Sequence, residues 1–222
     1  MSVVLSVNVG RVVPTAHSDV RVTGIDKRPV SEPVMVREPG PRGAGGSGVV
    51  GDPICDLRHH GGSDQAVYSY AREDLDIWER DLERTLRCGA FGENLTTQGI
   101  DVTASLIGER WLVGDRCLLE VTSPRIPCRT FAGWLAEERW IRRFTRRGVP
   151  GAYLRVITPG EVRAGDAITV VQRPDHDITI GFMFRAMTTE KSSFPHLAAA
   201  GDALPIAIRR DLDVVASGSG TD

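Results

Sequence analysis

One cysteine, Cys128, is flanked by residues that favour a reactive thiol. Cys128 ends the run Ser-Pro-Arg-Ile-Pro-Cys, in which Pro124 and Pro127 restrict the backbone that leads to it. The sequence predicts a helix directly after Cys128. A thiol at a helix start, flanked by Arg125 and Arg129, favours the thiolate form, which is a nucleophile and a soft metal ligand. The pattern therefore indicates that Cys128 is a reactive thiol rather than a small buried hydrophobic residue.

The remaining cysteines have no such surroundings. Cys55, Cys88 and Cys117 are interpreted as small buried hydrophobic residues, and none of the cysteines forms a Cys-x-x-Cys pair. This spacing argues against an iron–sulfur cluster and a disulfide framework, so the chain shows no electron relay of its own. A zinc site built on Cys55 and His59 is a less favoured alternative, because a clear set of four ligands is missing.

The segment His59-His60-Gly61-Gly62 predicts a tight turn beside a ligand. Its glycines allow backbone N–H groups to converge on an anion. Adjacent histidines point in different directions when the chain is extended, so we expect at most one of them to face a pocket. The alternative is a turn with one structural histidine.

Two further segments carry polar side chains that could hold a ligand. Glu93 and Asn94 could orient a polar group, although spacing alone favours an Asx-type turn. Lys27 and Arg28, which precede Pro29, could bind phosphate, although solvated surface charge is the commoner explanation.

Composition limits the classes of function. The 222 residues include 41% hydrophobic and 25% charged residues, as expected for one globular domain with at most a small appendage. A net charge of −2 argues against a general binder of nucleic acid or anionic membranes. The arginine-rich run 139–147 is interpreted as a solvated helix face, with partner contact as the weaker alternative. Since no apolar run reaches the ~20 residues that span a bilayer and no signal peptide is evident, we expect no membrane association and a cytoplasmic location.

Short strands dominate the elements that must position these residues. Hydrophobic periodicity predicts strands over 2–13, 33–37, 49–57, 65–70, 111–113, 117–122, 151–158 and 167–172. It predicts helices over 71–86 and 130–147, and loops over 39–48 and 91–99. The predicted class is mostly β, an antiparallel β-barrel over residues 1–175 with a few flanking helices. Residues 176–222 are expected to form a short helical C-terminal appendage, ending in a frayed tail over 217–222.

Five segments in this order resemble the MOSC-domain family. They are residues 60–68, 91–100, 107–115, 123–128 and 151–166, and the closest subgroup is the bacterial proteins that confer resistance to hydroxylaminopurine. The resemblance implies a MOSC-type β-barrel that holds the molybdenum cofactor, molybdopterin, with Cys128 as the protein thiolate on the metal. The residues that it assigns to cofactor binding are Lys27, His60, Gly61, Gly62, Asn94, Arg125 and Cys128. Those that it assigns to catalysis are Cys128, His60 and Asn94.

The family resemblance also implies an activity. Its chemistry is the reduction of small N-hydroxylated compounds, such as N-hydroxylated purine bases and amidoximes, to amines. Because this chain lacks a ferredoxin-like cysteine set, we expect a separate reductase to deliver the electrons. One alternative is a carrier of the cofactor, or of sulfur as a persulfide on Cys128, without turnover. Another is a metal-free thiol enzyme or anion-binding protein that uses the same pocket.

Overall fold

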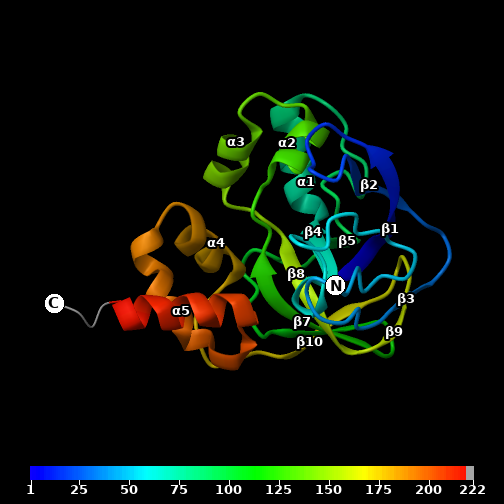
Figure 1. The fold of residues 1–222 in the computed structure, drawn as a ribbon. Helices are drawn as coiled ribbons and strands as arrows, with labels where there is room; N and C mark the ends of the chain where they lie inside the picture. Colours follow the sequence, from blue (N-terminus) through cyan, green and yellow to red (C-terminus); the bar gives the residue numbers. More distant parts are fainter. Residues whose placement is uncertain (219–222) are drawn as a thin grey trace.

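Eight strands form one mixed sheet in the computed structural model, which describes residues 1–218. Their order across the sheet is β10-β6-β7-β8-β4-β5-β1-β2 (Figure 1). The strands are β1 (Val3–Pro14), β2 (Val22–Pro29), β4 (Val67–Ala71), β5 (Leu95–Gln98), β6 (Arg110–Val113), β7 (Cys117–Pro124), β8 (Ala152–Thr158) and β10 (Ile168–Gln172). A separate two-stranded sheet pairs β3 (Val34–Val36) with β9 (Gly160–Val162).

The predicted closed antiparallel barrel is not confirmed. The strands β4 and β5 run parallel, joined by a connection that contains helix α1 (Arg72–Leu82). The start of β1 approaches the start of β10 through one isolated bridge, Val3 to Ala167. Three backbone hydrogen bonds flank it, from Val4 N to Asp166 O at 2.9 Å, from Gly165 N to Val4 O at 2.8 Å and from Ile168 N to Ser2 O at 2.8 Å. Contact between β1 and β10 ends there, because the rest of β1 pairs with β5 and β2.

Most of the predicted strands are confirmed, two stretches are corrected, and the strand β2 was not predicted. The predicted strand over 49–57 is wrong: only Val49 makes an isolated bridge, to Val36, and Asp52 turns inward to accept a hydrogen bond. Leu95–Gln98, predicted as loop, is β5, an interior strand of the sheet between β4 and β1. Its sequence Leu-Thr-Thr-Gln is short and polar, so hydrophobic periodicity gave no signal for it.

The helix predicted over 130–147 is two helices. The first, α2 (Arg129–Leu135), ends at Ala136, and the second, α3 (Trp140–Arg147), begins after Arg139. Both Ala136 and Arg139 have a φ of 54°, which breaks the helix although neither residue is glycine. Similarly, α1 stops at Leu82 rather than at residue 86, because Glu83 adopts a left-handed conformation.

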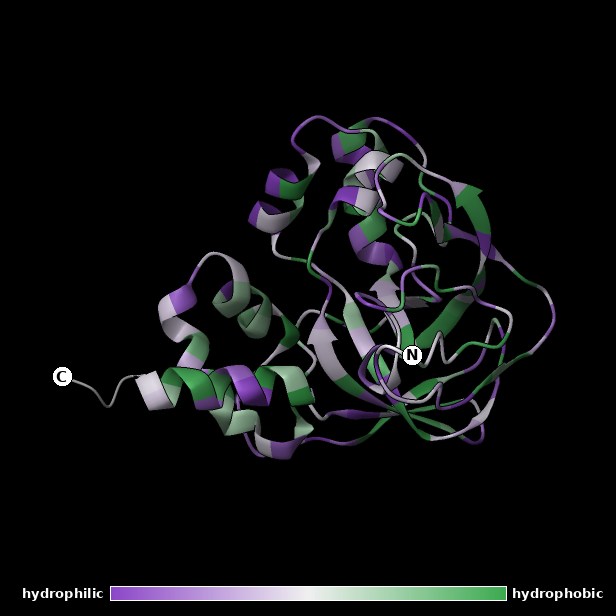
Figure 2. Cartoon of the chain, viewed as in Figure 1, coloured by the Kyte–Doolittle hydropathy of each residue, from purple (hydrophilic) through white to green (hydrophobic). Residues whose placement is uncertain are grey.

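Aromatic packing fixes α1, α2 and α3 against one another. Trp78, Phe91, Phe131, Trp140 and Phe144 are buried, and their ring centroids lie 4.6–6.2 Å apart in the contacting pairs. Hydrophobic and hydrophilic residues alternate along α1 and α3 (Figure 2), as expected for helices that bury one side. This cluster holds the start of α2 in place, and with it Cys128.

The C-terminal helices pack on the sheet (Figure 1). The helical segments predicted there are confirmed as α4 (Ile180–Thr188), the 3₁₀ segment η2 (Lys191–Ala203) and α5 (Ile206–Gly218). Most of their buried side chains belong to the same core cluster as those of the sheet, so the division of the chain at residue 175 stays a prediction. Of the predicted tail, residues 217 and 218 belong to α5, and 219–222 lie outside the described residues. In residues 1–218, no helix is long and apolar enough to cross a membrane.

Candidate functional site

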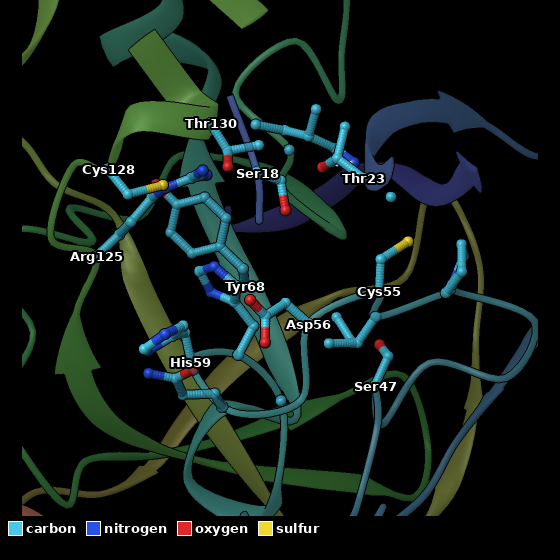
Figure 3. A pocket seen from close by; sticks show the side chains of 18 of the residues that line it. Ser18, Thr23, Ser47, Cys55, Asp56, His59, Tyr68, Arg125, Cys128 and Thr130 are labelled. Carbon is cyan, nitrogen blue, oxygen red and sulfur yellow. Dashed lines mark hydrogen bonds between the residues drawn. The ribbon is translucent and has the colours of Figure 1, made fainter. Parts of the chain in front are cut away.

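A pocket of about 590 Å³ collects nearly all the predicted site residues. Its lining comes from β2, the segment 53–61, β4, the loop that follows β7, and the start of α2. Cys128 and Arg125 lie on one side, whereas Cys55 and Ser47 lie on the other (Figure 3). The predicted residues that line the pocket are Lys27, His60, Gly61, Asn94, Arg125 and Cys128.

Cys128 occupies the position just before α2. Its backbone is extended, with φ −123° and ψ 172°, and its half-buried thiol is free and makes no capping hydrogen bond to the helix. The prediction of a helix directly after Cys128 is confirmed. The thiol is therefore presented to the pocket by a backbone that the aromatic cluster holds fixed.

Arg125 is a buried cation without a carboxylate partner. It is 8% exposed, and its Nη1 donates a hydrogen bond to Phe91 O. Its guanidinium carbon lies 4.1 Å from the ring centroid of Phe131 and 5.0 Å from that of Tyr68. No side chain in residues 1–218 forms an ion pair with it. Because a guanidinium stays charged and its burial is costly, this wall of the pocket favours an anionic ligand.

Lys27 is buried too, but its charge is compensated inside the protein. Its Nζ forms an ion pair with Asp52 Oδ2. The same oxygen accepts from Asn94 Nδ2 at 2.9 Å, and Asp52 Oδ1 accepts from Gly10 N at 2.7 Å. Burial lowers the pKa of Lys27, and Asp52 opposes this only in part. Sequence reasoning missed Asp52. The alternative of solvated surface charge at Lys27 is wrong, because the side chain is buried, and its role in cofactor binding stays a prediction.

Asn94 lines the pocket, although its side-chain amide already forms hydrogen bonds with other residues of the protein. Besides the bond to Asp52, its Oδ1 accepts from Tyr68 N at 3.2 Å and its Nδ2 donates to Asn8 O at 3.3 Å. Its neighbour Glu93 is buried and accepts hydrogen bonds from three groups nearby. These contacts give both residues a structural role, so a direct role of Asn94 in binding or catalysis stays a prediction.

Both histidines of the predicted turn line the pocket, so the expectation of at most one is wrong. The chain turns here instead of extending: His60 N donates to Asp56 O at 3.1 Å. Burial and, to a smaller extent, the positive charge of Arg125 together lower the pKa of His60 to about 4. The imidazole is therefore neutral at physiological pH and can both donate and accept a hydrogen bond.

The pKa of His60 has a measurable consequence for stability. Its value in the folded protein is lower than in the unfolded chain, so the unfolded state binds more protons between about pH 6.5 and pH 4. Unfolding free energy is thus expected to fall as pH falls through that window. We expect His60→Gln to lose less unfolding free energy than wild type between pH 7 and pH 4.5, measured by urea denaturation. Equal losses in the two proteins would contradict a depressed pKa at His60.

The glycine pair allows close packing against a neighbouring loop, and the role of Gly61, which lines the pocket, in cofactor binding stays a prediction. Gly61 and Gly62 have φ values of 80° and 84°. A Cβ on Gly61 would lie 2.7 Å from Gly46 O, and one on Gly62 would lie 2.6 Å from the Cα of Arg42. Gly62 N donates to Gly46 O at 3.0 Å, and Gly62 does not line the pocket. The turn is therefore packed against the glycine-rich loop 39–48, and no feature supports the predicted ligand role of Gly62.

The other cysteines differ from one another. Cys117 is buried in the main core, and burial raises its pKa to about 12, which confirms the prediction of an inert hydrophobic residue. Cys88 is half-buried outside the pocket. Cys55 is half-buried but lines the pocket, which its sequence context did not indicate. Within residues 1–218, no three His, Cys, Asp or Glu side chains are grouped to hold a metal ion, so the zinc alternative finds no ligand set.

A known protein family matches the part of the chain that carries most of the predicted pocket residues. The model of the MOSC domain matches residues 56–169, which is half of the chain and includes His60, Asn94, Arg125 and Cys128. The chain belongs to the MOSC-domain family. The resemblance seen in the sequence is thereby confirmed.

Individual relatives of this MOSC protein support the same assignment. YflK of Bacillus subtilis, an uncharacterized protein, is 32% identical over 183 residues, which cover 82% of this chain and 79% of YflK. A protein of Gibberella moniliformis named "Reductase" is 32% identical over 78% of this chain, but the match spans only 30% of that protein. The crystal structure of YiiM from Geobacillus stearothermophilus has a TM-score of 0.76 and 26% identity, covering 96% of this chain and 98% of YiiM. These matches are consistent with the hydroxylaminopurine-resistance subgroup.

Proposed function

We propose that this MOSC protein binds the molybdenum cofactor and reduces small N-hydroxylated compounds, bases or amidoximes, to amines. One observation carries the proposal: the free thiol of Cys128 and the buried, unpaired guanidinium of Arg125 share one pocket. A thiolate can ligate a soft metal, and the guanidinium can bind anionic groups of the same ligand.

The donor set of the pocket fits a cofactor that brings most of its own metal ligands. A metal bound by protein side chains alone would need a group of ligands that residues 1–218 do not assemble. Molybdopterin carries its own sulfur ligands and needs one protein thiolate, which Cys128 can supply. Its phosphate and other anionic groups would find Arg125 available, whereas the ammonium of Lys27 is already paired with Asp52.

The reaction needs two electrons and two protons: R–NH–OH + 2 e⁻ + 2 H⁺ gives R–NH₂ + H₂O, with cleavage of the N–O bond. When bound, the cofactor would supply the oxygen-accepting redox chemistry that this cleavage requires. The neutral imidazole of His60 can hold the N–OH group by donating or accepting a hydrogen bond. The rings of Tyr68 and Tyr153, with centroids 5.1 Å apart, give the pocket an aromatic wall that suits a planar base.

The relative named "Reductase" supports reductive chemistry, and its extra length bears on the electron source. Most of that protein has no counterpart in this chain, because the match spans 30% of it. The four cysteines of this chain also lack the spacing of an iron–sulfur cluster. We therefore propose that electrons come from a separate reductase.

The test uses full-length protein purified without oxygen from a host that makes the cofactor. We expect stoichiometric molybdenum by elemental analysis, and reduction of 6-N-hydroxylaminopurine to adenine with reduced methyl viologen as donor. Protein from a host that cannot make the cofactor is the control. Metal-free protein that carries a persulfide on Cys128, or protein with molybdenum and no turnover, would contradict the reductase and favour a carrier.

A further inference from the structure

Helix α3 presents two unpaired arginines to solvent. Arg142 and Arg146 lie one turn apart on its exposed side, opposite the buried Trp140 and Phe144. Neither arginine forms an ion pair with any residue from 1 to 218, unlike their neighbours. Those neighbours pair as Arg139 with Glu138, Arg143 with Glu137, and Arg147 with Asp81. Arg142 and Arg146 therefore keep their charge free for another molecule.

Apolar side chains connect this arginine pair with the mouth of the pocket. Ile141 is 42% exposed on α3 and Ile126 is 41% exposed in the loop after β7, yet both line the pocket. No other large hydrophobic side chain exposed to this degree in residues 1–218 lines it. We call Ile126, Ile141, Arg142 and Arg146 the α3 surface. Exposed apolar residues with arginines beside them are typical of the centre and rim of a protein interface.

The charges of the α3 surface indicate the kind of partner. The two arginines attract an acidic protein locally, although the chain as a whole has a net charge of −2 and weakly repels it. A local basic patch overcomes such repulsion and orients the encounter, because charges steer association at short range. In Figure 2, α3 shows hydrophilic segments interleaved with hydrophobic ones, as a mixed apolar and basic contact requires.

We propose that an acidic redox protein docks on the α3 surface and delivers electrons at the pocket mouth. This inference rests on the proposed function, since it names the partner of the same site. The partner, a flavoprotein or an iron–sulfur protein, supplies two electrons in each turnover, and a one-electron carrier such as a [2Fe–2S] ferredoxin supplies them in two successive encounters. Those electrons and two protons from solvent cleave the N–O bond, and amine and water leave.

The experiment measures binding, independently of turnover. Two probes are used with the cofactor-loaded protein: a purified flavodoxin and a plant-type [2Fe–2S] ferredoxin, both acidic. We expect wild type to bind at least one probe at low salt, and the double variant Arg142→Glu/Arg146→Glu to raise its Kd at least ~10-fold. The difference should disappear at about 1 M salt, where the screening length is about 3 Å.

The matched control is Arg116→Glu/Arg210→Glu. These arginines are also exposed, lie outside the pocket lining and form no ion pair in residues 1–218, and their reversal changes the net charge equally. We expect the control to raise the Kd less than ~3-fold, as for charges far from an interface. Equal losses in the two double variants, no loss in either, or no binding of either probe by wild type would overturn the proposal. Wild-type turnover with methyl viologen tests the proposed function separately.

Discussion

Replacing Cys128 with alanine is expected to remove N-hydroxyl reduction and most of the bound molybdenum. The thiol is the one group on the pocket wall that the proposed function assigns to the metal. Loss of a residue that hydrogen-bonds to a metal ligand typically costs 10–100-fold in metal affinity or activity. We therefore expect loss of the ligand itself to lower metal affinity and activity by more than ~100-fold. Metal content by elemental analysis and turnover with methyl viologen measure the two effects.

The control for this variant is another half-buried cysteine. Cys88→Ala removes a thiol that does not line the pocket, and it should keep full metal content and activity. Cys128→Ser tests whether an oxygen can replace sulfur as ligand, and we expect it to resemble Cys128→Ala. Circular dichroism should show that all three variants fold. Full metal content and turnover in Cys128→Ala would contradict the assignment of Cys128.

Replacing Lys27 with methionine is expected to destabilise the whole protein. The change leaves the carboxylate of Asp52 buried with only two uncharged donors, Gly10 N and Asn94 Nδ2. Removing one partner of a buried ion pair typically costs ~3–5 kcal/mol, and we expect the lower end because those donors remain. Urea denaturation at pH 7 measures the loss of unfolding free energy.

The adjacent residue provides a matched control. Arg28 is half-exposed and pairs with Asp26 at 2.7 Å, so Arg28→Met should cost at most ~1 kcal/mol. Asp52→Asn in the Lys27→Met background should restore part of the stability, because the buried negative charge is then gone. If Lys27→Met cost no more than Arg28→Met, the buried pair would not stabilise the fold.

The sequence predicted the parts of the site that depend on local chemistry. The turn at His60, the bend before Cys128 and the start of α2 each depend on glycines, prolines or charges within a few residues of the site. The hairpin of β6 and β7 was also predictable, since Gly114 and Asp115 lie between two β-rich runs. Such signals depend on residues that are close together in the sequence, so they can be recognised without knowledge of the fold.

Long-range pairings could not be predicted in this way. Lys27 meets Asp52 across 25 residues, and neither side chain signals in sequence that it will be buried. The parallel neighbours β4 and β5 are linked through α1, and their pairing depends on which face that helix covers. The break between α2 and α3 occurs at Ala136 and Arg139, residues that usually continue a helix. Tertiary packing of the aromatic cluster accounts for that break.

The shared core of sheet and C-terminal helices has a consequence for biosynthesis. Ile180, Met183, Leu197 and Leu204 complete the same apolar cluster as Val4 and the strands that follow it. These side chains follow the strands in the chain, so the nascent sheet keeps an uncovered apolar face until they have been synthesised. We expect ribosome-bound chains that end near residue 175 to recruit chaperones or aggregate, and emergence of the C-terminal helices to bury that face.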